Sequence, residues 1–192
     1  MELQLIRSLI RPWRLSDRAA IVKHANSRNV WINLRDRFPH PYTAADADAW
    51  LHYAARRQPS DHFAIEVDGE AVGGIGLELQ DDVHRHSAEL GYWLGEAMWG
   101  RGIMSEAVAA FTRFGFSTYR LCRIYALVFE WNPASARVLE KAGFVLEGRL
   151  RKSVTKAGRI IDQFLYAVVR EAPEPPEPPK EGWTRIRLVD GR

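Results

Sequence analysis

Apolar residues recur along the chain with two periods, and the period changes at glycine, proline and helix-capping residues. Spacings of three and four residues predict a helix over 44–57, which begins after the capping residue Thr43. A longer apolar face of the same period predicts a helix from residue 103 onward. A shorter helix is predicted over 134–142, because Gly143 then supplies the left-handed residue that commonly follows a helix.

Alternating residues and short apolar runs predict the strands. Two of the strands are joined at Asp68-Gly69, a dipeptide typical of a two-residue hairpin turn. The predicted strands lie at 5–12, 62–67, 70–79, 87–95, 122–129, 144–152 and 159–170, and a first helix follows the first strand near 19–22. This order of elements predicts an α/β (α+β) fold with one mixed, mostly antiparallel sheet and helices on both of its faces.

The chain of 192 residues is long enough for one domain with a sizeable core. We expect that domain to occupy residues 1–171. Proline and glutamate dominate residues 172–182, a composition that predicts an extended, semi-rigid linker. Residues 183–192 follow as a short tail with strand-like alternation, which is too short to be stable alone.

The segment from Glu89 to Ala107 predicts a strand, a glycine-containing turn and the start of a helix. Such a turn directs backbone N–H groups at an anion, and the helix start adds partial positive charge, so the segment is typical of a pyrophosphate site. The sequence lacks the Gly-x-x-x-x-Gly-Lys-Ser/Thr loop of ATP-binding proteins, and Ser105 stands where the dinucleotide fingerprint has its third glycine. A nucleotide cofactor other than ATP or NAD is therefore indicated.

The turn Trp99-Gly100-Arg101-Gly102-Ile103-Met104 resembles the acetyl-CoA loop of the GNAT N-acetyltransferases, in the form found in the ribosomal-protein N-terminal acetyltransferases. Two further segments resemble the same branch. One runs from Asn132 through Ser135 to Phe144, and the other runs from Pro41-Tyr42 to Trp50. The resemblance covers residues 8–170.

This resemblance implies acetyl-CoA as the co-substrate, held where the strands at 87–95 and 122–129 separate. It also implies that Ser135 donates a proton to the coenzyme A thiolate, because Leu139 stands where a relative has a tyrosine for this task. Asn132 and Ser135 also suit helix-capping positions, so a structural role is an alternative for both. The residues expected to bind the cofactor are Trp93, Leu94, Trp99, Gly100, Arg101, Gly102, Ile103, Met104 and Asn132.

The general base does not follow from the resemblance. Relatives carry a glutamate at the position of Leu127 or of Val154, and both residues are aliphatic here. An α-amine, with a pKa of about 8, loses a proton more easily than a lysine amine at about 10.4, so an acceptor of low pKa is favoured. Glu89, on the strand expected to line the cleft, is the candidate catalytic carboxylate, and a solvated strand position is its alternative. The residues expected on the acceptor side are Trp31, Tyr42 and Asp162.

The resemblance therefore implies an N-acetyltransferase that moves an acetyl group from acetyl-CoA to a primary amine by direct transfer in a ternary complex. The acceptor is either a protein N-terminal amine or a small-molecule amine. A non-catalytic acyl-CoA-binding module is the alternative from a different class, since both expected glutamates are missing. We expect a monomer or a homodimer.

Composition and charge argue against several other classes. The formal net charge of +3 is small and the Lys and Arg residues do not form blocks, so no nucleic-acid partner is expected. No apolar run reaches the ~18 residues of a membrane span and the N-terminus lacks a signal-peptide pattern, so we expect no membrane partner and a cytoplasmic location. Cys122 is the single cysteine, and His84 and His86 have no third ligand nearby in the sequence, so no metal is expected.

Overall fold

A computed structural model of the chain describes residues 1–56 and 61–171. Its strands form one sheet in the order β1-β2-β3-β4-β5-β6-β8-β7, in which β5 and β6 are parallel and the other neighbours are antiparallel. The predicted linker at 172–182 and tail at 183–192 lie outside the described residues. The strands are β1 Leu3–Gln4, β2 Leu9–Arg11, β3 His62–Val67, β4 Glu70–Leu79, β5 Ser87–Leu94, β6 Arg123–Phe129, β7 Val145–Lys156 and β8 Arg159–Val169.

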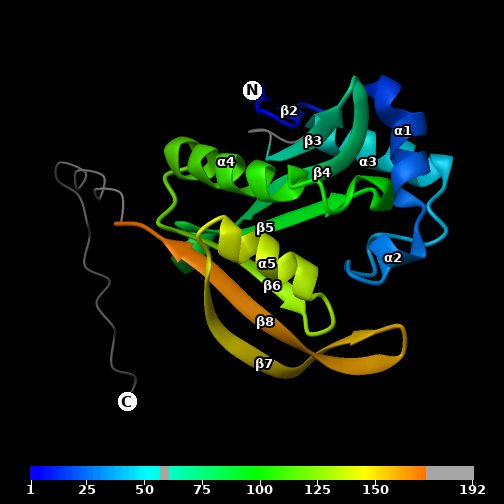
Figure 1. The fold of residues 1–192 in the computed structure, drawn as a ribbon. Coiled ribbons are helices and arrows are strands. Elements are labelled where there is room, and N and C mark those ends of the chain that lie inside the picture. The colour runs from blue at the N-terminus through cyan, green and yellow to red at the C-terminus, as the bar shows by residue number, and fades with distance from the viewer. Residues whose placement is uncertain (57–60, 172–192) are drawn as a thin grey trace, which may run out of the picture.

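Helices cover both faces of the sheet, so the predicted fold class is confirmed (Figure 1). Two helices, α4 and α5, lie over one face, and α1 and α3 pack together on the other, as the two core clusters show. Within the described residues, no helix combines the length and the apolar composition that a membrane span needs. The helices are α1 Arg18–Ala25, α2 Arg28–Trp31, α3 Ala44–Arg56, α4 Ile103–Thr118 and α5 Pro133–Lys141, with short 3-10 turns at Leu15–Asp17, Asp82–His84 and Glu96–Met98.

Three local signals in the sequence are confirmed by the backbone. Thr43 and Asp46 cap the start of α3 reciprocally: the Asp46 carboxylate accepts from the Thr43 N–H at 2.8 Å, and the Thr43 hydroxyl accepts from the Asp46 N–H at 3.3 Å. Asp68 and Gly69 both have positive φ, 50° and 81°, as the tight β3–β4 turn requires. Gly143 follows α5 with a φ of 90°.

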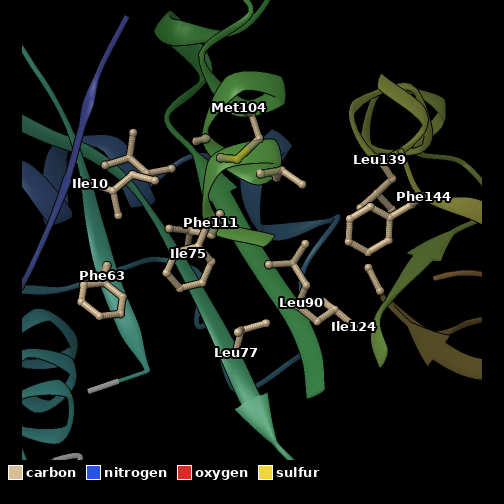
Figure 2. Close-up of a cluster of buried hydrophobic side chains, with 14 of the residues drawn as sticks. Ile10, Phe63, Ile75, Leu77, Leu90, Met104, Phe111, Ile124, Leu139 and Phe144 are labelled. Carbon is tan, nitrogen blue, oxygen red and sulfur yellow. The ribbon is translucent and has the colours of Figure 1, made fainter. Parts of the chain in front are cut away.

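The larger core lies between the sheet and α4 and α5 (Figure 2). Phe63 and Leu77 of the sheet are covered by Phe111 of α4, and Leu139 of α5 and Phe144 close the core toward β6. A second, smaller cluster packs α1 and α3 against the opposite face of the sheet, with Ile21, Ala25, Tyr42, Ala47 and Leu51 buried. The sheet is therefore covered on both faces near its centre, and this packing holds the strands that line the site in place.

The predicted strand at 5–12 is wrong in its first half. The chain makes a turn there, in which the Leu5 N–H donates to the Ser8 carbonyl at 2.9 Å, and only β2 continues as a strand. The Glu106 carboxylate on α4 accepts from the backbone N–H groups of Ile6 and Arg7 at 3.0 and 3.1 Å. A contact with a residue 100 positions along the chain thus stabilises the turn, and no local pattern carries that information.

Candidate active site

The two parallel strands at the centre of the sheet separate after a short paired stretch. Residues Ser87–Glu89 of β5 pair with Arg123–Tyr125 of β6, and the β5 residues beyond Glu89 continue without pairing to β6. Among the described residues, Gly91–Leu94 therefore have no strand partner on the side that faces β6, where the Leu94 carbonyl accepts instead from Trp99 Nε1. A cleft of about 970 Å³ opens at the separation, at the place predicted from the sequence.

One end of the cleft is formed by the turn before α4. Gly100 and Gly102 have φ values of 75° and 76°, a conformation that costs a residue with a Cβ atom. The exposed Trp99 side chain is held by a hydrogen bond from its Nε1 to the Leu94 carbonyl at 2.8 Å. A Cβ atom built at Gly100 meets no atom within 4 Å, so the turn faces open space beside the helix start.

Ile103 and Met104, the first residues of α4, line the cleft with atoms close to the turn. Their side chains are 3% and 7% exposed and belong to the core, and Figure 2 shows Met104 pointing into it. A ligand at the turn therefore meets mainly their backbone. The exposed Arg101 lies between the two glycines of the same turn.

Asn132 and Ser135, at the start of α5, have different hydrogen-bonding roles. The Asn132 side chain is the N-cap of α5, since its Oδ1 accepts from the Ser135 N–H at 3.1 Å. The Ser135 hydroxyl is instead 2.7 Å from the Tyr92 hydroxyl. Both residues line the cleft, so Ser135 presents an oxygen there that is not used as a cap.

Tyr92 lies on β5 and points to the same face of the sheet as α4 and α5. Burial raises the pKa of Tyr92 well above its usual range, and the hydrogen bond with Ser135 opposes this shift in part. The phenol is therefore neutral near pH 7. Either hydroxyl can donate in its 2.7 Å contact with the serine hydroxyl, and the phenol also donates to the Ser135 carbonyl at 3.3 Å.

The opposite face of β5 belongs to the side of α1–α3. The Glu89 carboxylate there forms an ion pair with Arg35 and its side chain is 18% exposed. Phe38 packs edge-on against Trp93 and tilts against Tyr42, so aromatic rings form the neighbouring wall. Burial raises the pKa of Tyr42 to about 12, and the charge of Asp46 adds to the shift.

Two residues expected on the acceptor side do not line the cleft. The Asp162 carboxylate accepts from the Lys152 N–H at 2.7 Å and from Arg149, and these contacts lower the pKa of Asp162. Trp31 lies under the ammonium of Lys156, 4.0 Å from Nζ to the ring centroid. The structure therefore places Asp162 and Trp31 in contacts within the fold, whereas Glu89 and Tyr42 face the cleft.

A smaller hollow of about 320 Å³ lies beside the cleft. Leu127 and Val154, the positions where relatives carry glutamates, both line it with aliphatic side chains. Lys156 also lines the hollow, and its Nζ is 2.7 Å from the Oδ1 of Asp36. The hollow therefore has aliphatic side chains at the two positions where relatives carry the glutamate.

His62, the first residue of β3, lines the cleft on the α3 side. Its Nδ1 is 2.6 Å from the Oδ1 of Asp61, which is 1% exposed. The imidazole also packs edge-on against the rings of Trp50 and Tyr53.

The sequence profile described as an acetyltransferase (GNAT) domain matches residues 7–145. The chain belongs to the GNAT acetyltransferase family. Among curated relatives, the N-acetyltransferase YoaA of Bacillus subtilis is 39% identical over 101 residues, 53% of this chain and 56% of YoaA. The ribosomal-protein-serine acetyltransferase of Escherichia coli is 32% identical over 105 residues, 55% of this chain and 58% of that enzyme. The matched segments thus span little more than half the length of these relatives.

Among solved structures, Mycobacterium smegmatis RimJ in complex with a CoA disulfide superimposes with a TM-score of 0.75 at 26% identity, over 85% of this chain and 82% of that one. The relatives of this GNAT domain thus include ribosomal-protein acetyltransferases, as the resemblance predicted.

Two cleft residues, Tyr92 and His62, were not predicted from the sequence, and neither was the pairing of Arg35 with Glu89. Tyr92 alternates with the flanking Gly91 and Trp93 along β5, and only the sheet register shows that it faces α5. Arg35 is brought to Glu89 from a loop 54 residues earlier. For His62 the sequence does contain a local signal, the adjacent pair Asp61-His62 at the start of a strand. A carboxylate beside an imidazole is a common way to orient a base.

Proposed function

We propose that this GNAT protein transfers an acetyl group from acetyl-CoA to a primary amine by direct attack of the amine on the thioester while both substrates are bound. The cleft at the β5–β6 separation carries the proposal. It has a glycine turn and a helix start at one end, and the hydroxyl pair of Tyr92 and Ser135 on its wall. Free backbone groups, an anion site and a proton donor are the three features that this reaction needs.

The roles follow from the placement of the residues. The turn at 99–104 binds the pyrophosphate through backbone N–H groups, and the free β5 edge at Trp93 and Leu94 binds the pantetheine arm. Bound acetyl-CoA supplies the activated acyl group. Ser135 donates a proton to the departing thiolate, and Tyr92 holds the serine hydroxyl in place. Asn132 retains its amide N–H₂ group for the cofactor, because its cap uses only Oδ1.

The acceptor enters from the side of α1–α3, where aromatic rings and the Glu89–Arg35 pair form the walls. A carboxylate near an aromatic wall attracts an ammonium group, so Glu89 orients the acceptor amine. We propose a protein N-terminal amine as the acceptor, in line with the ribosomal-protein acetyltransferases among the relatives. A small-molecule amine is the second candidate, since the Escherichia coli L-amino acid N-acetyltransferase AaaT is 26% identical over 163 residues.

The test has two stages. Thermal-shift assays with acetyl-CoA and with free coenzyme A measure binding. Thiol release is then measured with peptides beginning with Ala, Ser or Met, with free amino acids, with phenethylamine and with spermidine. We expect both forms of the cofactor to stabilise the protein and a subset of the amines to release coenzyme A.

Mass spectrometry of a cell extract incubated with the protein and labelled acetyl-CoA then identifies the natural acceptor. Cofactor binding without thiol release on any amine would instead support a non-catalytic acyl-CoA-binding module. Absence of binding would contradict the cofactor assignment itself.

A further inference from the structure

The proposed reaction requires a group that takes a proton from the amine, and the positions where relatives carry a glutamate are aliphatic. Of the described residues that line the cleft, His62 is the only histidine, and none is a cysteine. Imidazole is the side chain that titrates near neutral pH without perturbation. The position of His62 and its hydrogen-bond partners therefore decide whether it can take the proton from the amine.

The carboxylates of the cleft differ in how they are held. Glu89 pairs with Arg35 and Asp46 accepts hydrogen bonds from Thr43, whereas Glu78 lies 3.9 Å from Arg37 and its Oε2 has no hydrogen bond among the described residues. The hydrogen bonds from Thr43 lower the pKa of Asp46. A carboxylate stabilised in its charged form is a weak base, so Asp46 is poorly suited to remove the proton, and Glu89 already holds a guanidinium group.

The register of the sheet places His62 next to the open part of β5. His62 pairs with Gly76 of β4, and Gly76 pairs with Gly91 of β5. The His62 ring covers Gly76, because a Cβ atom built there would lie 2.7 Å from the imidazole Cδ2. A Cβ atom built at Gly91 meets nothing within 4 Å. Directly opposite Cβ positions are about 5 Å apart, so the imidazole lies beside the empty space over Gly91.

That space is where β5 has just left β6. Gly91 is two residues beyond Glu89, the last β5 residue that pairs with β6, and lies on the same face of the strand. Side chains larger than hydrogen at Gly76 and Gly91 would fill the gap between His62 and the strand separation. The two glycines therefore form an open floor between the imidazole and the place where the free β5 edge begins.

Asp61 fixes the orientation of the imidazole. With Nδ1 donating to the buried Asp61 carboxylate, Nε2 carries the lone pair, and Nε2 is bonded to the Cδ2 atom that lies over Gly76. Among the described residues, no hydrogen bond occupies Nε2. The carboxylate also stabilises the imidazolium that forms when Nε2 takes a proton.

We propose that His62, oriented by Asp61, is the general base that accepts a proton from the acceptor amine, either directly or through one water. This role rests on the proposed function. Nε2 takes one proton from the ammonium form of the amine and passes it to solvent. The free amine then forms the N–C bond, the C–S bond breaks, and the thiolate gains a proton from Ser135. The second nitrogen proton passes through water to Ser135 and restores its hydroxyl. The products are an amide, a neutral thiol and one proton in solution.

The groups that share this end of the cleft bear on any pH dependence. They are Asp61 next to His62, Asp46 and Tyr53 on α3, Glu78 on β4 with Arg37 beside it, and Glu89 on β5 with Arg35. Of the side-chain types in this set, imidazole is the one whose ordinary pKa lies in the neutral range, so a neutral inflection that disappears in His62→Gln reports the imidazole.

The test measures kcat, KM and their pH profiles with the best amine of the panel named above. We expect kcat/KM of the wild-type protein to rise with pH through an inflection in the neutral range, where imidazole is the side chain that ordinarily titrates. His62→Gln, which keeps the size and polarity of the side chain, should lower kcat about 100-fold and remove the inflection. The Kd for acetyl-CoA should stay within about twofold, since the base does not hold the cofactor.

Two further variants separate catalysis from structure. Added imidazole should restore part of the turnover of His62→Ala, because a free base can occupy the vacated space. Asp61→Asn should move the inflection to lower pH, because the imidazolium loses the anion beside it. His52→Gln is the matched control: His52 is an exposed histidine on α3 whose Nδ1 contacts the Asp48 carbonyl, and its replacement should change neither kcat nor the profile.

The outcomes distinguish this role from the function on which it rests. Wild-type turnover without an inflection between pH 5.5 and 7.5, or a folded His62→Gln variant with wild-type kcat, overturns the base assignment and leaves the acetyltransferase function standing. Cofactor binding without wild-type turnover on any amine overturns the proposed function together with the base.

Discussion

At the scale of single residues, Asn132 and Ser135 show how a structure separates roles that a sequence leaves together. Both residue types suit a helix start, so capping was an open alternative for each. In the structure Asn132 takes the cap and the Ser135 hydroxyl binds Tyr92. The serine oxygen is therefore placed by a phenol that burial keeps neutral, which is the arrangement that a proton donor requires.

Replacement of the proposed acid gives the sharpest prediction at this scale. Ser135→Ala should lower kcat by roughly 100-fold or more, because the thiolate then leaves without a proton donor. The affinity for coenzyme A should change much less, and so should the melting temperature, since Asn132 still caps α5. Turnover and melting temperature measured on one preparation decide the matter: a destabilised but fully active variant contradicts the catalytic role.

Asn132→Ala is the matched counterpart. Loss of the N-cap should cost about 1 kcal/mol of stability, which corresponds to a fall of roughly 2–4 °C in melting temperature for a domain of this size. If Asn132 also binds the cofactor, the Kd for acetyl-CoA should rise as well. Differential scanning fluorimetry and calorimetric titration separate the two effects, and an unchanged melting temperature would contradict the cap.

The turn before α4 gives a prediction about backbone conformation. Gly102→Val should lose acetyl-CoA binding, because a side chain at a φ of 76° strains the turn that directs N–H groups at the pyrophosphate. Gly69→Val is the control, because Gly69 has a φ of 81° in the β3–β4 turn and a Cβ atom built there meets no atom within 4 Å, while one at Gly102 meets the Arg7 side chain, at 3.5 Å. Both variants should lose stability, and only Gly102→Val should lose binding in thermal-shift assays. Unchanged affinity in a folded Gly102→Val protein would move the site elsewhere.

At the scale of elements, sequence reasoning works where the determinants are local. The capping pair at Thr43, the Asp68-Gly69 turn and Gly143 each act within a few residues, and all three were predicted. The turn in the predicted strand at 5–12 depends on Glu106 and was missed. β7 runs to Lys156, beyond the predicted end at 152, because Val154–Lys156 resume pairing with Arg159–Ile161 after register shifts at 146–148 and 150–154.

The candidate site follows the same division. The glycine turn and the start of α5 could be proposed as site elements from the sequence because each is a contiguous motif. The pairs Tyr92–Ser135 and Glu89–Arg35 join elements far apart in the sequence, and only the sheet register brings them together. Asp162 and Trp31 were expected beside the acceptor. In the structure Asp162 accepts from the Lys152 N–H and Trp31 lies under Lys156, and both lysines belong to β7.

The hairpin contact gives a prediction at this scale. The Lys156 side chain is 1% exposed and joins the hairpin tip to the segment at 31–36 through Trp31 and Asp36. Lys156→Met removes the cation–π contact and the ion pair and should cost about 1 kcal/mol. Because Asp36 and Lys156 line the hollow on the acceptor side, we expect KM for the amine to rise several-fold while KM for acetyl-CoA stays constant. Equal changes in both KM values would indicate a general loss of structure.

At the scale of the whole molecule, the residues proposed to serve the cofactor and those proposed to serve the acceptor lie on opposite faces of the sheet. Adjacent β5 residues point to opposite faces: Tyr92 toward α5 and the proposed acid, and Trp93 toward the aromatic wall on the side of α1–α3. In the proposed reaction the cofactor and the acceptor therefore approach from different sides and meet where β5 and β6 separate. Direct transfer between them would use this opening in the sheet.

The last prediction concerns how much of the chain this arrangement needs. The last strand of the described residues ends at Val169, and the Arg170 N–H donates to the Cys122 carbonyl at 2.9 Å while its guanidinium lies over the Phe116 ring. The proline-rich composition that follows predicts few core contacts across 172–182. A protein truncated after Glu171 should therefore remain folded and bind acetyl-CoA within a few-fold of the full chain, as measured by circular dichroism and calorimetric titration. Aggregation or a large fall in melting temperature on truncation would show that the segment from Trp183 to Val189 is an integral part of the fold.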